Sequence, residues 1–327
     1  METRKLGRTE LELSVIGFGA WAIGGGEYIF GWGPQDDEDS IKAIHKALDM
    51  GVNWIDTAPV YGLGRSEEVV GRAIKGIRNE IIIATKCGRI WDTERNISAS
   101  LKADSVRQEA EDSLRRLNTD VIDLYQIHWP DPVEDIEEGW STVAKLVEEG
   151  KIRYPALSNF SVEQMELMGA IHPIASLQPP YSMLRRDIEA DILPYCSEQG
   201  IGVVPYSPMQ NGLLTGKFTK ERIQDLPDDD FRKTRSPFFR EPEVDVNLKL
   251  VEALRPIARR HERTLSQLAL AWVLRRPEVT SAITGARKPK QIEETALAGD
   301  WELDDWTISQ IEALLEKRDE ELAGLKA

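Results

Sequence analysis

Short apolar segments alternate along the chain with longer segments in which apolar residues recur at helical spacing. The short segments are rich in Val and Ile and end abruptly in polar residues, which is typical of buried parallel strands. This pattern predicts eight strands: Val15–Gly19, Val52–Asp56, Ile81–Lys86, Val121–His128, Arg153–Ser158, Ile174–Gln178, Gly202–Tyr206 and Ser281–Thr284. Since most strands are followed by a helical segment, the sequence favours an α/β fold of the (β/α)₈ TIM-barrel type. An open doubly wound sheet is the alternative, although Gly24-Gly25-Gly26 after the first strand lacks the GxGxxG spacing typical of that fold.

Capping residues mark several helix boundaries. The segment Asp37–Met50 starts with acidic residues, which suit the positive end of a helix dipole, and it stops at Gly51. Residues 105–117 and 134–149 are amphipathic. Ser161-Val162-Glu163-Gln164 has the spacing of a capping box, which predicts that a helix begins there.

Two segments before and within the repeat do not fit it. Arg4–Leu6 and Leu11–Leu13 flank the turn Gly7-Arg8-Thr9-Glu10, which predicts a β-hairpin that would plug the amino-terminal mouth of the barrel. A long segment rich in Pro, Gly, Asp and Phe runs from Tyr206 to about Val244. Loops of that length are usually functional or disordered.

The end of the chain adds to the barrel repeat. The tail from Asp304 to about Leu325 predicts one or two extra helices. Nothing in the composition resembles an interdomain linker. Residues 1–327 are therefore predicted to form one (β/α)₈ domain with an amino-terminal hairpin plug and extra carboxy-terminal helices.

Composition limits the classes of function. The chain has 327 residues, 56 acidic and 41 basic, and a formal net charge of −15, which argues against nucleic-acid binding and against docking on anionic lipid. No apolar run reaches the ~20 residues of a membrane span, and no apolar leader follows the first residues, so we predict a cytoplasmic protein without a membrane partner. Cys87 and Cys196 form no CxxC motif and the four histidines are scattered, so neither a disulfide nor a metal site is predicted.

Polar side chains follow the predicted strands at the ends where barrel enzymes place their active sites. Strand two ends at Asp56, with Tyr61 five residues further on. Strand three ends at Lys86 and strand four at His128. Each residue alone has an ordinary explanation, such as a turn cap or a core histidine. Together at one mouth they form an acid–base set.

The charges of this set indicate its chemistry. A lysine beside a tyrosine favours the tyrosinate, so Lys86 is predicted to lower the pKa of Tyr61 from about 10. Asp56 would hold the lysine charged and oriented, and His128 would orient a carbonyl oxygen or share the proton. Such a set suits protonation of a carbonyl oxygen while another group delivers hydride.

Lys86 also permits a different reaction. An aldolase would use a lysine at a barrel strand end as a Schiff-base nucleophile. It would not need the amide-rich pair Asn159 and Gln178, nor Tyr206 as a platform. The residues themselves therefore favour carbonyl reduction and leave the aldolase as an alternative.

These residues lie in motifs that resemble those of the aldo-keto reductase superfamily, particularly its bacterial branch related to potassium-channel β-subunits. The matching segments are Gly51–Ala58, Tyr61-Gly62, Gly64–Glu67, Ala84–Lys86, Asp112–Leu117, Asp120, Ile122–His128, Leu157–Ser161, Pro205–Pro208, Gly212–Lys217 and Gly285–Pro289. The motifs occur in the right order across nearly the whole chain, which makes the resemblance specific. It implies a barrel with Asp56, Tyr61, Lys86 and His128 as the catalytic set and Tyr61 as the proton donor.

The resemblance also implies NADPH or NADP⁺, extended across the barrel mouth. Ser158, Asn159 and Gln178 would hold the nicotinamide carboxamide, and Tyr206 would stack on the ring. The backbone from Ser207 to Leu213 with Lys217 would follow the pyrophosphate, and Arg287 with Lys288 would meet the 2′-phosphate, since an arginine fork suits a phosphate monoester. The other residues implied around the cofactor are Trp21, Asp56, Pro208, Asn211, Gly212, Gly285, Gln291, Glu294 and Thr295.

The sequence departs from the family pattern in four places. Pro155 removes a backbone donor from strand five, which is therefore predicted to be bulged or locally unpaired, with a shift of the residues at its end. Thr284 and Thr295 stand where a proline and an asparagine are usual, and Met209-Gln210-Asn211 replaces a more typical Leu-Ala-Arg.

The sequence thus predicts an NADPH-dependent reductase of aldehydes or ketones that acts on a small carbonyl compound. Trp21, Trp91 and Trp129 near strand ends would suit flat or apolar substrates. An alternative is a module that binds NADP(H) and senses its redox state, with slow or vestigial chemistry. The oligomeric state stays open.

Overall fold

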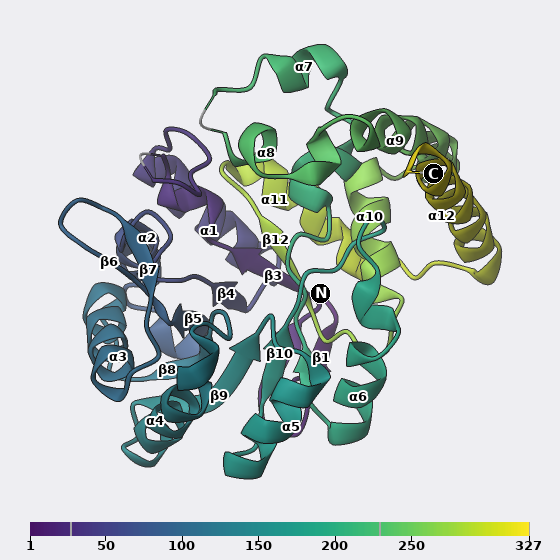
Figure 1. The fold of residues 1–327 in the computed structure, drawn as a ribbon. Coiled ribbons are helices and arrows are strands. Elements are labelled where there is room, and N and C mark those ends of the chain that lie inside the picture. Colours follow the sequence, from purple (N-terminus) through teal and green to yellow (C-terminus); the bar gives the residue numbers. More distant parts are fainter. Residues whose placement is uncertain (27, 229, 327) are drawn as a thin grey trace.

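Eight parallel strands form the centre of the molecule, with helices around them (Figure 1). The computed structural model describes residues 1–26, 28–228 and 230–326. The strands are β3 (Ile16–Gly19), β4 (Trp54–Asp56), β5 (Ile82–Cys87), β8 (Ile122–Ile127), β9 (Ile152–Ser158), β10 (Ser176–Gln178), β11 (Gly202–Val203) and β12 (Ala282–Gly285). They pair in the order β11-β10-β9-β8-β5-β4-β3-β12. The eight predicted strands are confirmed, with differences of a few residues at their ends.

Hydrogen bonds also join the two outer strands of this sheet. The backbone N–H of Thr280 donates to the carbonyl of Val203 at 2.8 Å, and that of Ile283 donates to Pro205 at 2.9 Å. Val203 and Val279 form a parallel bridge. The ring of strands is therefore a barrel of the predicted type.

Helices make most of the connections on the outside of the barrel. They are α1 (Asp37–Asp49), α2 (Arg65–Ala73), α3 (Ala103–Leu117), α4 (Ile136–Glu148), α5 (Val162–Ile171), α6 (Ile192–Gln199), α9 (Glu243–Arg260), α10 (Leu265–Leu274) and α11 (Pro289–Ala296). The predicted stop after α1 falls at Gly51, whose φ of 84° is one that glycine adopts without strain. The predicted capping box is present, with reciprocal bonds between the side chains of Ser161 and Gln164 and backbone N–H groups.

The predicted amino-terminal hairpin closes one mouth of the barrel. Strands β1 (Thr3–Lys5) and β2 (Glu12–Ser14) pair antiparallel. Leu6, Leu11 and Leu13 from the hairpin are buried at the floor of the barrel. Burial of these three side chains fixes which mouth remains for ligands.

Side-chain alternation then determines what lines the open mouth. Four neighbouring strands each pack one residue on the hairpin: Trp54, Ala84, Leu124 and Ala156. Side chains two positions apart in a strand point to the same face. Two positions further along, the interior residues at the opposite mouth are Asp56, Lys86, Gln126 and Ser158. The strand register alone therefore brings these polar groups together.

Strand β9 is regular, and the prediction of a bulge at Pro155 is wrong. Residues 152–157 pair with 122–127 of β8 at one constant offset, and Pro155 lies opposite Tyr125. The carbonyl of Pro155 accepts from the N–H of Ala175 on the β10 side. The missing N–H of proline points to that same side, where β10 begins only at residue 176, so the ladder loses little.

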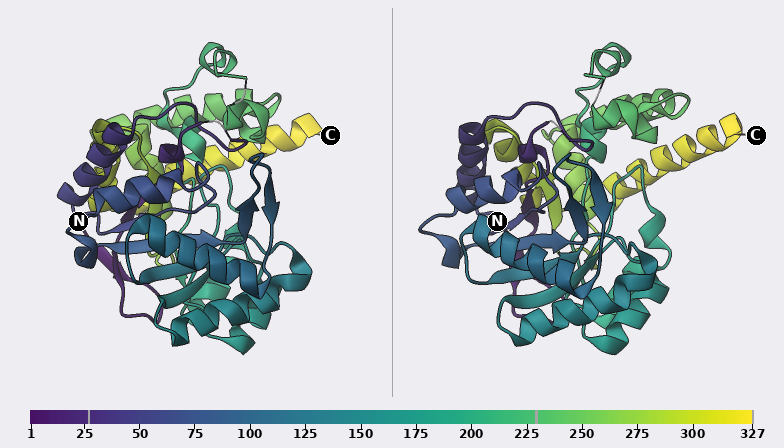
Figure 2. Two further views of the ribbon diagram at one scale, coloured as in Figure 1. Left: turned by 90° about the vertical axis from the view of Figure 1, so that its left-hand side faces the viewer. Right: turned by 60° about the vertical axis from the view of Figure 1, so that its left-hand side comes forward.

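The long segment after β11 contains two short helices, α7 (Lys220–Gln224) and α8 (Phe231–Thr234), near the open mouth (Figure 1). The tail forms one helix, α12 (Asp305–Lys326), which packs along α9. Lys249 and Glu321 form an ion pair at 2.7 Å between these helices. The last turns of α12 reach outward past the barrel (Figure 2).

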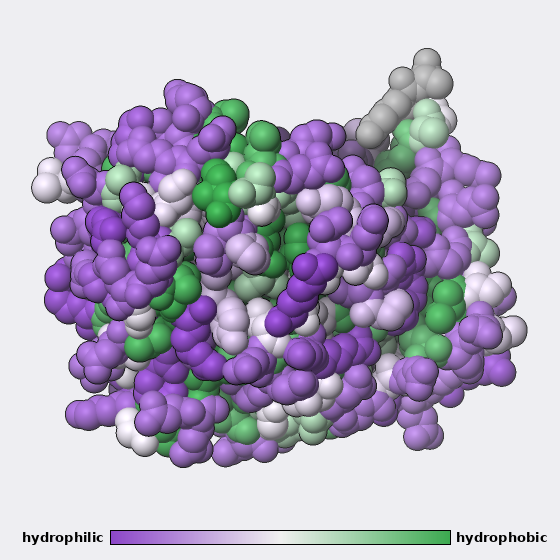
Figure 3. Space-filling view, turned by 90° about the horizontal axis from the view of Figure 1, so that it is seen from below, coloured by the Kyte–Doolittle hydropathy of each residue, from purple (hydrophilic) through white to green (hydrophobic). Residues whose placement is uncertain are grey.

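One face of the molecule shows a mainly polar surface. Viewed from the side that carries α5 and α6, it is largely hydrophilic, with hydrophobic side chains in separate groups (Figure 3). Among the helices that the structure describes, none combines the length and apolarity needed to cross a membrane.

Candidate active site

The strand ends bring Asp56 and Lys86 into a buried ion pair. The Lys86 Nζ donates to both carboxylate oxygens of Asp56 and to the carbonyl of Thr57, each at 2.8 Å. Both side chains are almost completely removed from solvent. Burial lowers the pKa of Lys86, while the Asp56 carboxylate opposes that effect. All three N–H groups of the ammonium are engaged, so a Schiff-base role for Lys86 does not fit this geometry.

Two glutamines complete the surroundings of the carboxylate. The side-chain amides of Gln126 and Gln178 donate to Asp56 Oδ1 at 3.1 and 2.7 Å. Gln178 also donates to Gln126 Oε1 at 3.2 Å. Gln126 lies directly opposite Lys86 in the β5–β8 register. The carboxylate is therefore fixed by four donors, two from the lysine and two from the amides.

Tyr61 lies beside this pair on the loop between β4 and α2. The Lys86 Nζ is 5.1 Å from the centre of the Tyr61 ring. The loop comes close because Gly24 and Gly62 face each other without side chains. A Cβ at Gly62, where φ is 67°, would lie 2.2 Å from the carbonyl oxygen of Gly24. The glycine run after β3 thus makes room for Tyr61.

The pKa of Tyr61 differs from the prediction. Burial raises it well above its usual value, and the negative charge of Asp56 adds to this effect. The Lys86 ammonium is directed at Asp56 and Thr57 rather than at the phenol oxygen, so its attraction for a tyrosinate does not outweigh the effect of burial. The predicted lowering of the pKa is wrong for this structure, and Tyr61 stays protonated at neutral pH.

His128 packs against the same tyrosine. The rings of Tyr61 and His128 meet edge to face with centroids 5.8 Å apart. Burial lowers the pKa of His128 well below its usual value, helped by the positive charges of Lys86 and Arg89. The imidazole is therefore neutral at neutral pH and suited to donate a hydrogen bond rather than a charge. All four predicted catalytic residues lie together.

The residues predicted for the nicotinamide form one connected group. Asn159 donates to the carbonyl of His128 and to Ser158 Oγ, both at 2.9 Å. Tyr206 donates its hydroxyl hydrogen to Asn159 Oδ1 at 2.9 Å, which fixes the orientation of the Tyr206 ring. Burial raises the pKa of Tyr206 to about 12. Asn159 has a φ of 65°, a left-handed conformation that asparagine tolerates better than most residues.

Left-handed residues also shape the segment predicted for the pyrophosphate. Ser207 and Asn211 have φ of 55° and 53°, and their side chains bond each other at 3.0 Å. Gly212 follows with a φ of 93°. Pro208 and Leu213 are buried beside them. Such backbone is costly and is typical of functional loops, because it turns N–H groups toward a ligand.

The residues predicted for the adenosine half lie on and beside α11. Lys217 pairs with Glu294 at 3.2 Å. Gln291 accepts from the backbone N–H groups of Arg287 and Lys288 at 2.8 and 3.0 Å. The other two members of this predicted set are Thr295, whose hydroxyl donates to the Gln291 carbonyl at 3.0 Å, and Gly285, which ends β12.

Arg287 is held by the loop that follows β3. Its guanidinium donates to Gln35 Oε1 at 2.7 Å, to the carbonyl of Trp32 at 3.1 Å and to the carbonyl of Pro34. Burial and the nearby Arg232 lower its pKa. Arg287, which was predicted to bind the 2′-phosphate, therefore already donates hydrogen bonds to groups of the protein itself.

Three features of the site were not predicted from the sequence. The Gln126 side chain donates a hydrogen bond to Asp56. The positive charge of Arg89 helps to lower the pKa of His128, after the effect of burial. The loop around Gln35 accepts the hydrogen bonds of Arg287. A signal existed for Gln126, because it is a polar residue inside a buried strand and lies two positions before His128. No comparable pattern marks the loop contacts.

The three tryptophans considered for the substrate take different places. Trp21 stacks on Tyr61 with ring centroids 6.2 Å apart. Trp91, on the hairpin of β6 (Arg89–Trp91) and β7 (Ile97–Ala99), packs against the Arg116 guanidinium of α3 at 5.9 Å. Trp129 is 40% exposed. Trp21 is thus the tryptophan in contact with the predicted proton donor.

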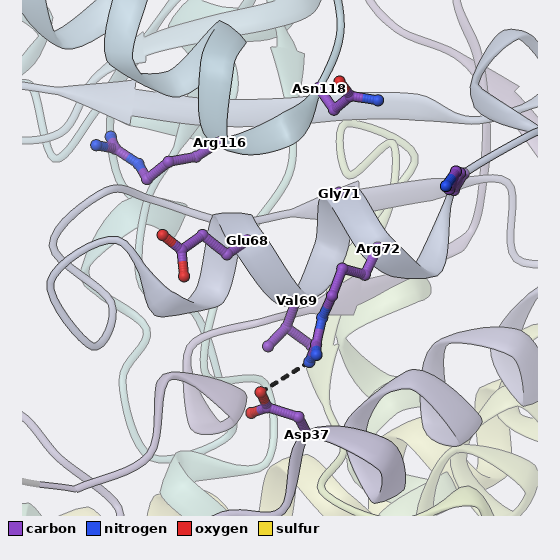
Figure 4. A pocket seen from close by; sticks show the side chains of 8 residues that line it. Asp37, Glu68, Val69, Gly71, Arg72, Arg116 and Asn118 are labelled. Atoms are coloured by element: carbon purple, nitrogen blue, oxygen red, sulfur yellow. Dashed lines mark hydrogen bonds and ion pairs between the residues drawn. The ribbon is translucent and has the colours of Figure 1, made fainter.

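A separate hollow lies on the outer surface along α2 (Figure 4). Glu68 and Arg72 of α2 line it together with Asp37 of α1 and Arg116 of α3, and Arg72 pairs with Asp37 at 2.7 Å. It includes none of the predicted catalytic residues. It therefore does not compete with the barrel mouth as the site.

Comparison with known proteins gives the class of this barrel and its site. Residues 15–316 match the model of the Aldo/keto reductase family. The chain therefore belongs to the aldo/keto reductase family, and it is an oxidoreductase.

Relatives match over nearly the whole chain. Aldo-keto reductase YhdN of Bacillus subtilis is 41% identical over 319 residues, which cover 97% of this chain and 94% of that protein. The NADH-specific methylglyoxal reductase of Escherichia coli is 35% identical, over 93% of this chain and 95% of its own. The structure of the glycerol dehydrogenase AKR11B4 from Gluconobacter oxydans superposes with a TM-score of 0.88 at 38% identity, covering 97% of this chain and 96% of that one.

Proposed function

We propose that this aldo/keto reductase uses NADPH to reduce aldehydes or ketones to alcohols, and that Tyr61 gives the proton to the carbonyl oxygen. One observation carries the proposal. Tyr61 lies beside both a buried cation and a neutral imidazole, with Lys86 Nζ 5.1 Å and the His128 ring 5.8 Å from the centre of its ring. A carbonyl oxygen placed between Tyr61 and His128 would meet two hydrogen-bond donors.

The charges support the direction of proton transfer. The raised pKa of Tyr61 keeps the phenol protonated before the reaction. As the carbonyl carbon gains hydride, its oxygen takes the Tyr61 proton, and a tyrosinate is left behind. The nearby Lys86 ammonium stabilises that anion, and the tyrosinate then recovers a proton from water. Asp56 keeps Lys86 in place throughout.

The residues at the mouth fit a nicotinamide cofactor. When bound, NADPH supplies the hydride. Gln178 and Asn159 offer amide groups at the strand ends, and Tyr206 offers a ring whose hydroxyl is fixed by Asn159. We assign the carboxamide to these residues with Ser158, and the pyrophosphate to residues 207–213 with Lys217.

The preference for NADPH rests on the charges near α11. Burial and the repulsion of the nearby Arg232 lower the pKa of Arg287, and the Asp230 carboxylate opposes this effect. A 2′-phosphate would relieve this repulsion. The Escherichia coli relative is named as NADH-specific, so members of the family differ in this respect.

The proposal is tested by steady-state oxidation of NADPH, and separately of NADH, with a panel of aldehydes, ketones and quinones. We expect sustained turnover with at least one carbonyl compound and a higher kcat/KM for NADPH than for NADH. One turnover followed by a stall with every compound would contradict an enzyme and favour the redox-sensing alternative.

A further inference from the structure

The guanidinium of Arg287 donates hydrogen bonds to three oxygens of one loop. Its three nitrogens donate to three different acceptors: Gln35 Oε1, the Trp32 carbonyl and the Pro34 carbonyl. Gln35 returns a bond, since its Nε2 donates to the carbonyl of Arg287 at 3.0 Å. We call these four residues the arginine lock.

Other contacts hold the loop on both sides of the lock. Arg65, the first residue of α2, donates to the Gln35 carbonyl at 2.5 Å and to Asp37 at 2.6 Å. The Trp32 N–H donates to the carbonyl of Gly25 at 3.0 Å. The Arg232 guanidinium lies 4.9 Å above the Trp32 ring. Residues 32–35 therefore form a tethered segment whose middle rests on Arg287.

The acceptors in the lock are neutral, so a charged phosphate would form stronger hydrogen bonds with Arg287 than they do. Two backbone carbonyls and one side-chain amide oxygen satisfy the hydrogen bonds of Arg287 without cancelling its charge. Arg232 nearby lowers the pKa of Arg287 further, and Asp230, which opposes this, is itself bound by Arg232 through both oxygens at 2.9 and 2.6 Å. Charge-assisted bonds to a phosphate are about twice as strong as neutral ones.

We propose that the arginine lock and the 2′-phosphate of NADPH compete for Arg287, so that binding of this phosphate releases residues 32–35. This inference rests on the proposed use of NADPH. The guanidinium has five N–H groups, and the lock uses three of them, one on each nitrogen. Every nitrogen that a bidentate phosphate contact could use therefore already carries one lock oxygen, which the phosphate oxygens would crowd. NADH has no such phosphate, so it leaves the lock closed.

The lock makes Gln35 a determinant of cofactor selectivity. A ligand that must open the lock binds with an affinity reduced by the fraction of molecules in which the lock is already open. Weakening the lock therefore tightens binding of phosphate-bearing ligands alone. The effect works through Arg287, although Gln35 itself would not contact the phosphate.

Calorimetric titration with adenosine 2′,5′-bisphosphate and with 5′-AMP separates this effect from nicotinamide binding. Gln35→Met keeps the side-chain length and removes the acceptor. Because a hydrogen bond to a charged group is lost, we expect the bisphosphate to bind about tenfold more tightly to Gln35→Met than to the unaltered protein. Binding of 5′-AMP should not change.

Hydrogen exchange at the Trp32 amide reports the state of the loop directly. We expect the bisphosphate, but not 5′-AMP, to speed exchange at this amide in the unaltered protein. Arg287→Ala should speed it without any ligand. Lys290→Ala removes an equal charge from α11 and serves as the matched control, with no change expected.

The outcomes distinguish the lock from the cofactor assignment. Preferential binding of the bisphosphate with no effect of Gln35→Met, and unaltered exchange at Trp32, would overturn the lock and leave NADPH preference standing. Equal binding of bisphosphate and 5′-AMP would overturn both. If Arg287→Ala leaves exchange at Trp32 unchanged, the lock is wrong whatever the cofactor.

Discussion

Two lysine–carboxylate pairs, one at each end of the proposed cofactor site, have opposite surroundings. Lys86 and Asp56 pair at 2.8 Å with side chains 0% and 4% exposed, whereas Lys217 and Glu294 pair at 3.2 Å with side chains 55% and 25% exposed. The first pair is fixed by neighbouring strands. The second joins a loop to α11, where water can replace either partner.

This difference separates two tasks. At the reaction end, groups must hold their charge and position without water, and only strand register gives such precision. At the adenosine end, loops and helix starts offer polar groups that can exchange partners, as Arg287 does in the arginine lock. Substitutions should therefore act on chemistry and stability at the first end and on ligand choice at the second.

The largest effect is expected for Tyr61→Phe. Loss of a positioned acid typically costs roughly 10²–10⁴ in rate, so turnover with a carbonyl substrate should fall by about that factor. Binding of NADPH, followed by fluorescence titration, should be retained. Tyr154→Phe is the matched control, because the Tyr154 hydroxyl accepts from Glu10 at the plugged end of the barrel. Unchanged turnover of Tyr61→Phe would remove the proposed role.

Lys86→Met should cost the most stability. Removing one partner of a buried pair leaves the other charge uncompensated, which costs about 3–5 kcal/mol of unfolding free energy. The same change at Lys217 should cost less than about 1 kcal/mol, as exposed pairs do. Urea unfolding of both variants measures the contrast. Similar losses in the two would show that the comparison of the two ends is wrong.

At the adenosine end, Arg287→Ala should change ligand choice. Loss of charge-assisted bonds to a 2′-phosphate, at about 1.5–3 kcal/mol each, should weaken NADPH binding by about 10- to 100-fold. The affinity for NADH should change little. Dissociation constants for both cofactors, with Lys290→Ala as control, measure the effect. An equal loss for both cofactors would argue against a contact with the 2′-phosphate.

Glu109 provides a pH-dependent test near the reaction end. Both of its carboxylate oxygens accept from the N–H of Gly88, at 3.1 and 3.0 Å, just after the strand that carries Lys86. Burial raises its pKa to about 7. Above an unfolded-state pKa of about 4.3, the folded protein keeps a proton that the unfolded chain releases.

Because the folded state binds more protons than the unfolded state in this window, the free energy of unfolding falls as pH rises through it. The contribution of Glu109 should fall by up to about 1.4 kcal/mol for each pH unit between about 4.3 and 7, and should be constant above pH 7. Glu109→Gln keeps an acceptor for Gly88 and cannot ionise, so the variant should lose less stability over this range. Urea unfolding at pH 5, 6 and 7 tests it, and parallel curves for the two proteins would contradict the prediction.

The strand framework could be predicted from sequence because it depends on local patterns. The eight apolar segments and the residues that end them placed Asp56, Lys86 and His128 at one mouth, and alternation within strands did the rest. Their roles came from the charges of the groups and from the family motifs. The role of Gln126 could not be predicted, because a single glutamine in an apolar strand does not indicate a particular function.

The remaining features depend on contacts that pattern does not encode. The raised pKa of Tyr61 follows from how deeply the ring is packed, and the regular pairing at Pro155 follows from where the next strand starts. The arginine lock joins residues more than two hundred positions apart through loop carbonyls. Carbonyl acceptors are present at every residue, so no sequence motif marks such a contact.

The amino-terminal hairpin has a practical consequence for handling the protein. Leu6, Leu11 and Leu13 seal the floor of the barrel, so a fluorophore or an immobilisation tether in residues 1–14 would strain the layer beneath the catalytic side chains. The outer turns of α12 reach away from the barrel and do not take part in sealing it (Figure 2). They are the better handle for an electrode, a bead or a reporter dye.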